Sequence, residues 1–325
     1  MNDVFKRLIT IIVLLSVIAV GGAYALLWGS AGPVAGPHRI VVADGSSLSK
    51  VTDQLVAKGA VPGSATSYRA MAKIFGSGDP VQAGEFEIPK GMGGGAVLDL
   101  LQHGRPVVQL LTIAEGTPSI IVQEKLTAIK GLTGAAPLPA EGSVLPNSYD
   151  WQRGETRSAV LARMTGAMDK TLAELWAKRK PTCLVNSPRD AVILASIVEK
   201  ETGKADERRT VAGVYCNRLR IGMKLDADPT VIYPITKGKP LGRRIKRSEL
   251  NAITGYNTYR EVGLPAGPIA NPGRDSIAAV LDPAPTKALY FVADGTGGHV
   301  FADTLPEHNA NVAKWYAIRR ARGEM

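Results

Sequence analysis

The most pronounced hydrophobic pattern in the chain is an unbroken apolar run near the N-terminus. From Leu8 to Trp28 every residue is apolar, small or hydroxylated, and Lys6 and Arg7 stand directly before the run. At about 1.5 Å of rise per residue, a helix of this length crosses a bilayer. The basic flank predicts that the N-terminus stays in the cytoplasm while the chain after Gly29 is exported. We therefore expect residues 1–29 to form a short cytoplasmic N-terminus and a single transmembrane anchor.

A cleaved signal peptide is the competing interpretation of the same run. Ala23-Tyr24-Ala25 has the small-x-small form of a cleavage site. The apolar residues Leu26, Leu27 and Trp28 continue the run beyond that site. This continuation favours a retained anchor.

Shorter periodic segments follow a Gly/Pro/Ala linker at residues 30–37. Alternating apolar positions predict strands, and apolar positions three and four apart predict helices. The expected elements are a strand at His38–Val42, helices at Leu48–Val56 and Ala65–Ile74, a strand at Gln82–Ile88 and a short helix at Ala96–Gln102. This βααβ order within residues 38–105 resembles the LysM modules that bind cell-wall glycan. A plain spacer or packing domain fits the same order.

The remainder, residues 106–325, mixes helical and strand patterns. The expected strands are Val107–Ile113, Ala288–Ala293 and His299–Ala302, and the expected helices are Thr117–Ile129, Arg157–Arg179, Asp190–Thr202, Arg208–Leu219, Ser276–Leu281 and Glu307–Arg322. The predicted fold class is therefore α+β. It consists of an N-terminal transmembrane helix, a small LysM-like module and a mixed α/β catalytic domain with its catalytic Glu on a helix.

The candidate catalytic residue, Glu201, lies in the helix predicted at Asp190–Thr202, where Asp190 is the expected cap. Leu194, Ile197 and Val198 recur three and four residues apart, and Glu201 continues their face at about 100° per residue. Glu199 is turned about 200° away from Glu201 and is expected to point outward. Burial raises the pKa of a carboxyl group, which is how a Glu becomes a general acid near neutral pH. Alternatively, Glu201 ends the helix at its polar margin, and its carboxylate is solvated.

Loops rich in Tyr, Asn, Thr, Gly and Pro follow this helix. They are Leu225–Tyr233, Tyr256–Tyr259 and Gly263–Gly273. Rigid loops with aromatic and amide groups suit sugar binding, where ring faces stack and hydroxyls take hydrogen bonds. Ordinary loop packing is the alternative.

Composition and charge narrow the class of partner. The 325 residues are 45% hydrophobic, enough to supply real cores, and the net charge is +10. A basic chain suggests nucleic acid, but an exported domain meets anionic lipid and cell-wall polymer instead. The densest basic cluster comprises Lys237, Lys239, Arg243, Arg244, Lys246 and Arg247. It is either a solvated loop or a contact surface for an anionic polymer or the membrane.

Cysteine and histidine usage points to no metal and no cofactor. Cys183 and Cys216 are the only cysteines, and the sequence leaves open whether they form a disulfide or remain buried thiols. The four histidines form no His-x-x-x-His motif.

Several motifs in the second half of the chain, in this order, resemble the endolytic murein transglycosylases, the MltG or YceG-like family. They are Ala195–Thr202, Asn217-Arg218-Leu219, Gly222-Met223, Asp228–Tyr233, Tyr256–Tyr259, the Gly-Leu-Pro…Pro-Ile…Asn-Pro-Gly segment, and Tyr290–Ala293 with Gly297-Gly298-His299. The resemblance covers essentially the whole chain, and it identifies Glu201, the second Glu of the Glu-x-Glu pair, as the catalytic residue. The chain departs from the family pattern in two places. Leu145–Tyr149 reads Leu-Pro-Asn-Ser-Tyr where Phe-Pro-Asp-Thr-Tyr is frequent, so Asn147 receives no catalytic charge, and Cys216 replaces an aliphatic residue.

The resemblance implies cleavage of the bond between N-acetylmuramic acid and N-acetylglucosamine within peptidoglycan strands. Glu201 would protonate the bridging oxygen and then, as a base, activate the C6 hydroxyl of the muramic acid, which closes an anhydro ring without water. The substrate contacts we expect are Ser196, Asp228, Tyr233, Asn257 and Tyr259. The implied partners are glycan strands and the inner membrane, spanned once, with the catalytic domain on the extracytoplasmic side. Peptidoglycan synthases are a further partner that the resemblance raises.

Two other functions fit parts of the pattern. A glycoside hydrolase would pair Glu201 with a second carboxylate, for which Asp226 and Asp228 are candidates. A non-catalytic wall-binding scaffold would need neither. The anhydro ring of the product distinguishes the first from a transglycosylase, and a Glu201→Gln variant distinguishes the second.

Overall fold

The computed structural model describes residues 3–29 and 37–324 and divides into two compact units. Unit 1 contains residues 1–109 and 150–155, and unit 2 contains residues 110–149 and 156–325. The predicted linker lies almost wholly outside the described residues, and the predicted domain limits at residues 37 and 105 remain predictions.

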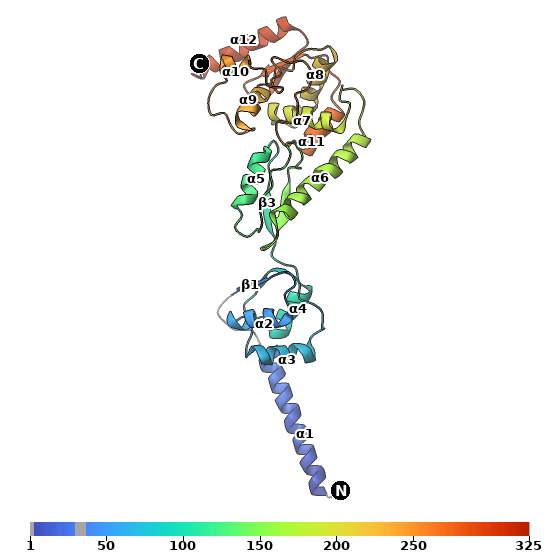
Figure 1. The fold of residues 1–325 in the computed structure, drawn as a ribbon, viewed down its shortest axis with the longest axis vertical. Helices are drawn as coiled ribbons and strands as arrows, with labels where there is room; N and C mark the ends of the chain where they lie inside the picture. Colours follow the sequence, from blue (N-terminus) through green and yellow to red (C-terminus); the bar gives the residue numbers. More distant parts are fainter. Residues whose placement is uncertain (1–2, 30–36, 325) are drawn as a thin grey trace. The chain divides into compact units, whose positions relative to one another are not determined.

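The N-terminal apolar run of unit 1 forms one helix (Figure 1). Helix α1 spans Asp3–Tyr24 and continues as a π-helix, η1, over Ala25–Gly29. Within it, Phe5–Tyr24 has a mean hydropathy of 2.1, and its side chains are exposed. Its length and composition suit a membrane span, and they suit a signal sequence equally.

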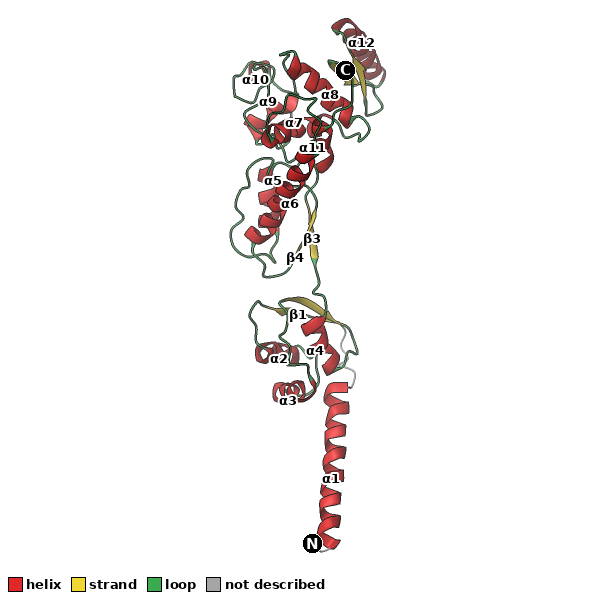
Figure 2. Ribbon diagram, turned by 90° about the vertical axis from the view of Figure 1, so that its right-hand side faces the viewer, coloured by secondary structure: helices red, strands yellow, loops and turns green. Residues whose placement is uncertain are grey.

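The rest of unit 1 is a small α/β module in which two helices follow the first strand. Its elements are β1 (His38–Val42), α2 (Leu48–Ala57), α3 (Ala65–Phe75), β2 (Gly84–Ile88) and α4 (Gly94–His103). Strands β1 and β2 pair antiparallel, with Ile40 opposite Phe86. Both residues are fully buried against Leu55 and Tyr68. Figure 2 shows β1 in yellow and the helices α2, α3 and α4 of the same module in red. The predicted βααβ order is therefore present. Apolar residues of the two strands and the two helices pack together in one core.

Unit 2 is mainly helical, with short two-stranded pieces of sheet. Its elements are β3 (Gln109–Thr112), α5 (Ser119–Ala128), β4 (Ser148–Trp151), α6 (Arg157–Ala177), α7 (Pro188–Glu201), α8 (Arg208–Arg220), α9 (Asp228–Thr236), α10 (Arg247–Leu250), α11 (Arg274–Leu281), β5 (Tyr290–Ala293), β6 (His299–Ala302) and α12 (Leu305–Ala321). The unit boundary falls within β3 and β4. Strands β5 and β6 form an antiparallel hairpin as predicted.

Helix α7 is the centre of unit 2, in contact with α6, α8, α9 and α11 (Figure 1). Every residue from Ala191 to Val198 is buried, so the helix is covered on all sides rather than along the one face that the apolar spacing predicted. The predicted cap was also wrong. The helix begins two residues earlier, at Pro188, and Ser187 accepts the capping hydrogen bond from the backbone N–H of Asp190.

Helix α9 corrects a segment that was expected to be a loop. Helix α9 starts at Asp228, with Pro229 in its first turn, where the missing N–H of proline costs no hydrogen bond. The hydroxyl groups of Thr230 and Thr258 lie 2.9 Å apart and are fully buried, which fixes α9 against the loop that carries Tyr259. Helix α10 is a single turn that begins at Arg247, the last residue of the basic cluster.

A disulfide bond joins Cys183 to Cys216, with their Cα atoms 4.9 Å apart. Cys183 lies between α6 and α7, and Cys216 lies in α8. This settles the alternative that the sequence left open and ties α8 to the segment that enters α7.

Candidate active site

Glu201 is the last residue of α7, and its side chain lines a pocket of about 660 Å³. The pocket is lined by Lys200, Glu201, Tyr215, Arg218, Asp226, Asp228, Pro229, Tyr259, Tyr290, Phe291, Leu305, His308 and Asn309. These residues come from α7, α8, the start of α9, the loop around Tyr259, strand β5 and α12. The fold thus gathers one candidate acid and several hydrogen-bonding groups in one hollow.

The pKa of Glu201 is raised to about 7. Burial is the main cause, and the nearby charge of Asp228 adds to it. A hydrogen bond from Tyr215 and the positive charge of Arg218 oppose the shift by favouring the ionised form. Near neutral pH, Glu201 therefore exists in both protonation states and can donate a proton or accept one.

Tyr215 and Arg218 reach Glu201 from the same face of α8, three residues apart. The Arg218 guanidinium donates from Nε to the backbone O of Leu289 and from Nη1 to that of Leu225, each at 2.7 Å. These bonds hold the cation in place in a largely buried position. Sequence reasoning missed both side chains, although a charged residue on an otherwise buried helical face was a usable indication.

Asp228 and Tyr259 form a second pair in the pocket. The Tyr259 hydroxyl donates to Oδ1 of Asp228 at 2.7 Å, and both were predicted as substrate contacts. Asp226 also lines the pocket, with its backbone at a φ of 49°, a left-handed conformation that non-glycine residues seldom adopt. Such strain accumulates where a fold holds a side chain in a required place.

The far wall of the pocket comes from the C-terminal helix and hairpin. The ring of His308 on α12 stacks on Tyr290 of β5, with centroids 5.2 Å apart. Burial and the charge of Arg218 lower the pKa of His308, which favours the neutral ring. Leu305, His308 and Asn309 had no indication in the sequence, because a polar residue on an amphipathic helix does not reveal what its tip faces.

Three predicted substrate contacts lie outside this pocket. Ser196 has no exposed surface, and its hydroxyl donates to the backbone O of Ile193 and accepts from the backbone N–H of Ile269. Asn257 is 1% exposed and donates to the backbone O of Leu250, among others. Both amount to corrections, since a buried side chain with its polar atoms already bonded cannot reach a glycan.

Tyr233 is the third of these residues, and it is partly exposed. Its hydroxyl donates to the Glu141 carboxylate at 3.2 Å, and its ring lies 4.9 Å from that of Tyr256. It lies apart from the residues that surround Glu201.

Glu199 does not point into solvent as predicted. Its carboxylate accepts hydrogen bonds from the backbone N–H of Gly273 at 2.9 Å and from the Ser276 hydroxyl at 2.7 Å. It therefore caps the N-terminus of α11. Glu199 does not line the Glu201 pocket. Of the Glu-x-Glu pair, Glu199 therefore caps a helix, and Glu201 faces the pocket.

No group of three or more His, Cys, Asp or Glu side chains within residues 3–29 and 37–324 has the arrangement of a metal site. The polar side chains that line the pocket carry carboxyl, guanidinium, ammonium, phenol, imidazole and amide groups.

The architecture and the pocket define a mixed α/β protein with a buried carboxyl group suited to general acid catalysis. The sequence model of the YceG-like family matches residues 40–314, and the chain belongs to that family. The resemblance drawn from the motifs is thereby confirmed.

Named relatives agree with this assignment. The endolytic murein transglycosylase of Streptococcus pneumoniae is 29% identical over 362 residues, which cover 94% of this chain and 64% of that protein. The endolytic murein transglycosylase of Bacillus subtilis is 33% identical over 184 residues, covering 57% of this chain and 50% of that protein. A crystal structure of a putative YceG-like protein from Listeria monocytogenes matches with a TM-score of 0.54 and 25% identity, over 85% of this chain and 98% of the other. The chain therefore spans less than two thirds of the length of the streptococcal relative.

Proposed function

We propose that this protein is a membrane-anchored lytic transglycosylase that cleaves the bond between N-acetylmuramic acid and N-acetylglucosamine within peptidoglycan strands. The observation that carries the proposal is Glu201, a buried carboxyl group whose pKa of about 7 suits both a proton donor and a base. The names of the relatives supply the reaction and the polymer.

In the first half of the reaction, protonated Glu201 donates its proton to the bridging oxygen as the glycosidic bond breaks. The N-acetylglucosamine side leaves as an alcohol, and positive charge develops at the anomeric carbon of the muramic acid. In the second half, ionised Glu201 takes the proton of the C6 hydroxyl, whose oxygen closes onto the anomeric carbon. One carboxyl group returns to its starting state, and no water is consumed.

The neighbours of Glu201 divide the remaining work. The hydrogen bond from Tyr215 orients the Glu201 carboxyl group, and fixed Arg218 stabilises the ionised state that exists between the two proton transfers. Asp228, held by Tyr259, faces the pocket as a carboxylate that favours the developing positive charge on the sugar.

A glycoside hydrolase is the second candidate, because Asp228 lines the same pocket as Glu201. When two carboxyl groups of an enzyme flank one glycosidic bond, one acts as the acid, and the other activates a water or acts as the nucleophile on the opposite face of the sugar. The hydrogen bond from Tyr259 engages one oxygen of Asp228 and argues for an electrostatic role instead.

The remaining parts of the chain fit an enzyme of the cell envelope. We propose that α1 anchors the protein in the cell membrane and that unit 2 and the part of unit 1 that follows α1 lie on the extracytoplasmic side, where a disulfide such as that between Cys183 and Cys216 persists. The βααβ part of unit 1 is proposed to be a LysM-like glycan contact, and peptidoglycan synthases are proposed as partners.

The test uses the full chain in detergent with uncrosslinked glycan strands, read by product mass. Fragments one water lighter than hydrolysis products establish the anhydro ring, and Glu201→Gln should abolish them. Glu174→Gln, which removes an exposed carboxylate on α6, is the matched control. Products that retain the water would establish the hydrolase, and cleavage that survives Glu201→Gln would refute the assigned acid.

A further inference from the structure

Helix α8 has a second pocket on the side away from Glu201. The two residues that α8 contributes to the Glu201 pocket, Tyr215 and Arg218, are three apart, whereas Gly213, Cys216 and Arg220 line the other pocket. At about 100° per residue these two sets occupy opposite faces of the helix. The second pocket has a volume of about 650 Å³, which lies within the range of ligand sites.

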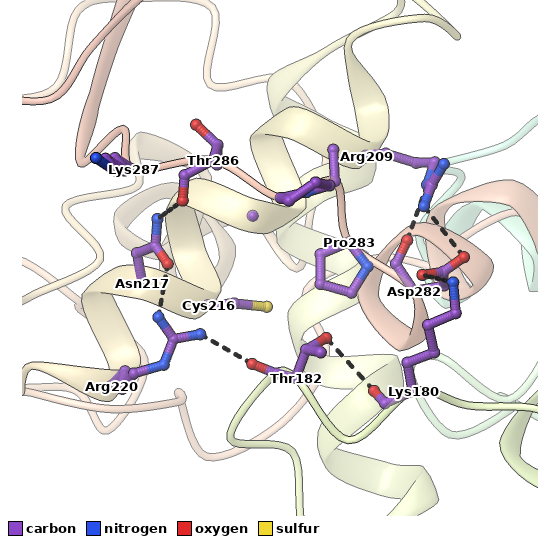
Figure 3. Close-up of a pocket in the computed structure, with 13 residues that line it drawn as sticks. Lys180, Thr182, Arg209, Cys216, Asn217, Arg220, Asp282, Pro283, Thr286 and Lys287 are labelled. Carbon is purple, nitrogen blue, oxygen red and sulfur yellow. Dashed lines mark hydrogen bonds and ion pairs between the residues drawn. The ribbon is translucent and has the colours of Figure 1, made fainter.

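The rim of this pocket is basic. Its lining includes four basic side chains and a single carboxylate, and these are Lys180, Arg209, Arg220, Lys287 and Asp282. In Figure 3, Arg220 and Lys287 lie at one end, with Asn217 between them, and Lys180 and Arg209 lie at the other end around Asp282. Both ends therefore carry net positive charge.

Within residues 3–29 and 37–324, the charge at the Arg220 end is held in place without an anionic partner. Nη1 of Arg220 donates to Oδ1 of Asn217 at 2.8 Å, and Nη2 donates to the backbone O of Thr182 at 2.9 Å. Both acceptors are neutral, so the guanidinium is oriented but its charge is not compensated. Among the residues that the structure describes, Lys287 has no ion-pair partner.

The charge at the other end is only partly compensated. Asp282 pairs with Lys180 and with Arg209, each at 3.1 Å, so one carboxylate faces two cations. A ligand with one carboxylate near Arg220 and a second near Lys180 would complete both ends.

The wall between the two ends is apolar and rigid. It consists of Pro283, Ala284 and Pro285 and the disulfide at Cys216. Gly213 allows this wall to approach α8, because a Cβ there would lie 2.7 Å from the backbone O of Ala284. Asn217 fixes the wall by donating to the backbone O of Thr286 at 2.9 Å.

We propose that this second pocket binds an acidic peptide, with carboxylates at its two basic ends and the peptide chain along the proline wall. Two separated positive ends on an apolar wall suit a peptide with two carboxylates better than a compact phosphate. The identification of this peptide with a stem of a peptidoglycan strand rests on the proposed function. The pocket would then hold a stem while the Glu201 pocket, across α8, holds a glycan chain.

The test measures binding of Ala-Glu-Ala-Ala, labelled at its N-terminus with an uncharged dye and with a free C-terminal carboxylate, to the full chain in detergent. Its uncharged counterpart, amidated Ala-Gln-Ala-Ala, should bind at least tenfold more weakly, because it lacks both carboxylates. The double variant Arg220→Gln/Lys287→Gln should weaken binding of the acidic peptide about tenfold. The control Lys130→Gln/Lys170→Gln, which removes two exposed cations elsewhere in the same unit, should leave binding unchanged. Lys287→Glu alone, at an exposed side chain, covers the case in which the double variant fails to fold.

Three results would overturn the proposal. They are equal binding of the two peptides, equal weakening by the control variant, and competition by inorganic phosphate at the concentration of the peptide, which would identify a simple anion site. The activity assay separates this proposal from that for Glu201. Cleavage of glycan without stems should be unchanged in Arg220→Gln/Lys287→Gln. Loss of that cleavage would mean that the substitutions disturb the Glu201 pocket through α8. A wild-type chain that binds the acidic peptide but cleaves no glycan would refute only the proposed function.

Discussion

Tyr259 donates its phenolic hydrogen to Asp228 across 2.7 Å, and the charge of Asp228 raises the pKa of Glu201. The three side chains come from different segments, and Asp228 sits in the first turn of α9, where the N-terminal end of the helix favours a carboxylate. Tyr259 therefore acts on the candidate acid through Asp228, as a positioning residue.

Replacing Tyr259 by Phe should lower kcat about tenfold and change KM little, because one hydrogen bond to a charged group is lost while the ring remains. The measurement is cleavage of stem-free glycan at pH 6 and pH 8. Tyr316→Phe, at an exposed tyrosine of α12, is the control. A rate equal to that of wild type would show that the orientation of Asp228 does not matter.

The rate should fall as the pH rises through the pKa of Glu201, about 7, since only the protonated carboxyl group can donate to the bridging oxygen. In Asp228→Asn the negative neighbour is gone, so the pKa of Glu201 drops and this limb of the pH profile moves to lower pH. The pH dependence of kcat/KM for both proteins is the measurement. Wild-type products that retain the water, together with complete loss of cleavage in Asp228→Asn, would instead assign Asp228 the second catalytic role of a hydrolase.

The burial of Glu201 also makes the free energy of unfolding depend on pH. The folded state binds the proton more tightly than the unfolded state, so stability is full below pH 4.5 and declines as the pH rises to about 7. By linkage the loss amounts to about 3 kcal/mol from a pKa near 7 against 4.5. Glu201→Gln should therefore exceed wild type in unfolding free energy at pH 8 and match it at pH 4, as measured by chemical denaturation. An equal gain from Glu174→Gln would show that the effect is one of overall charge.

The sequence predicted those helices whose formation depends on the spacing of apolar residues along the chain. The apolar spacing in Leu194–Val198 marked a buried helix, and the position of Glu201 at its end followed from the same spacing. Helix α9 was missed because two prolines, Pro229 and Pro234, lie within nine residues. What stabilises α9 is packing against α7 and the buried contact with Thr258, neither of which is visible in the local sequence.

The rest of the pocket is a product of long-range folding. Ser196 was predicted as a contact because it lies on the helix of the candidate acid, and Asn257 because it lies in a loop suited to sugar binding, but both side chains fix backbone segments instead. Arg218 and His308, which the sequence did not assign, line the same pocket as Glu201 only because the fold brings α8 and α12 to it. Polar residues in loops and on helices reveal their chemistry but not their partners.

The disulfide between Cys183 and Cys216 yields the last prediction, because Cys216 is next to Tyr215 in α8. The bond closes a loop with a sequence separation of 33 residues, and opening it should cost about 4 kcal/mol through the greater freedom of the unfolded chain. Cys183→Ser/Cys216→Ser should therefore unfold at lower denaturant concentration than wild type, and dithiothreitol should lower the stability of wild type alone. If the bond also positions α8, glycan cleavage by the folded double variant should be slower than cleavage by wild type. Glu201→Gln should remain inactive with and without dithiothreitol. Equal stability of the variant and the oxidised wild type would show that the two thiols do not pair in the folded protein.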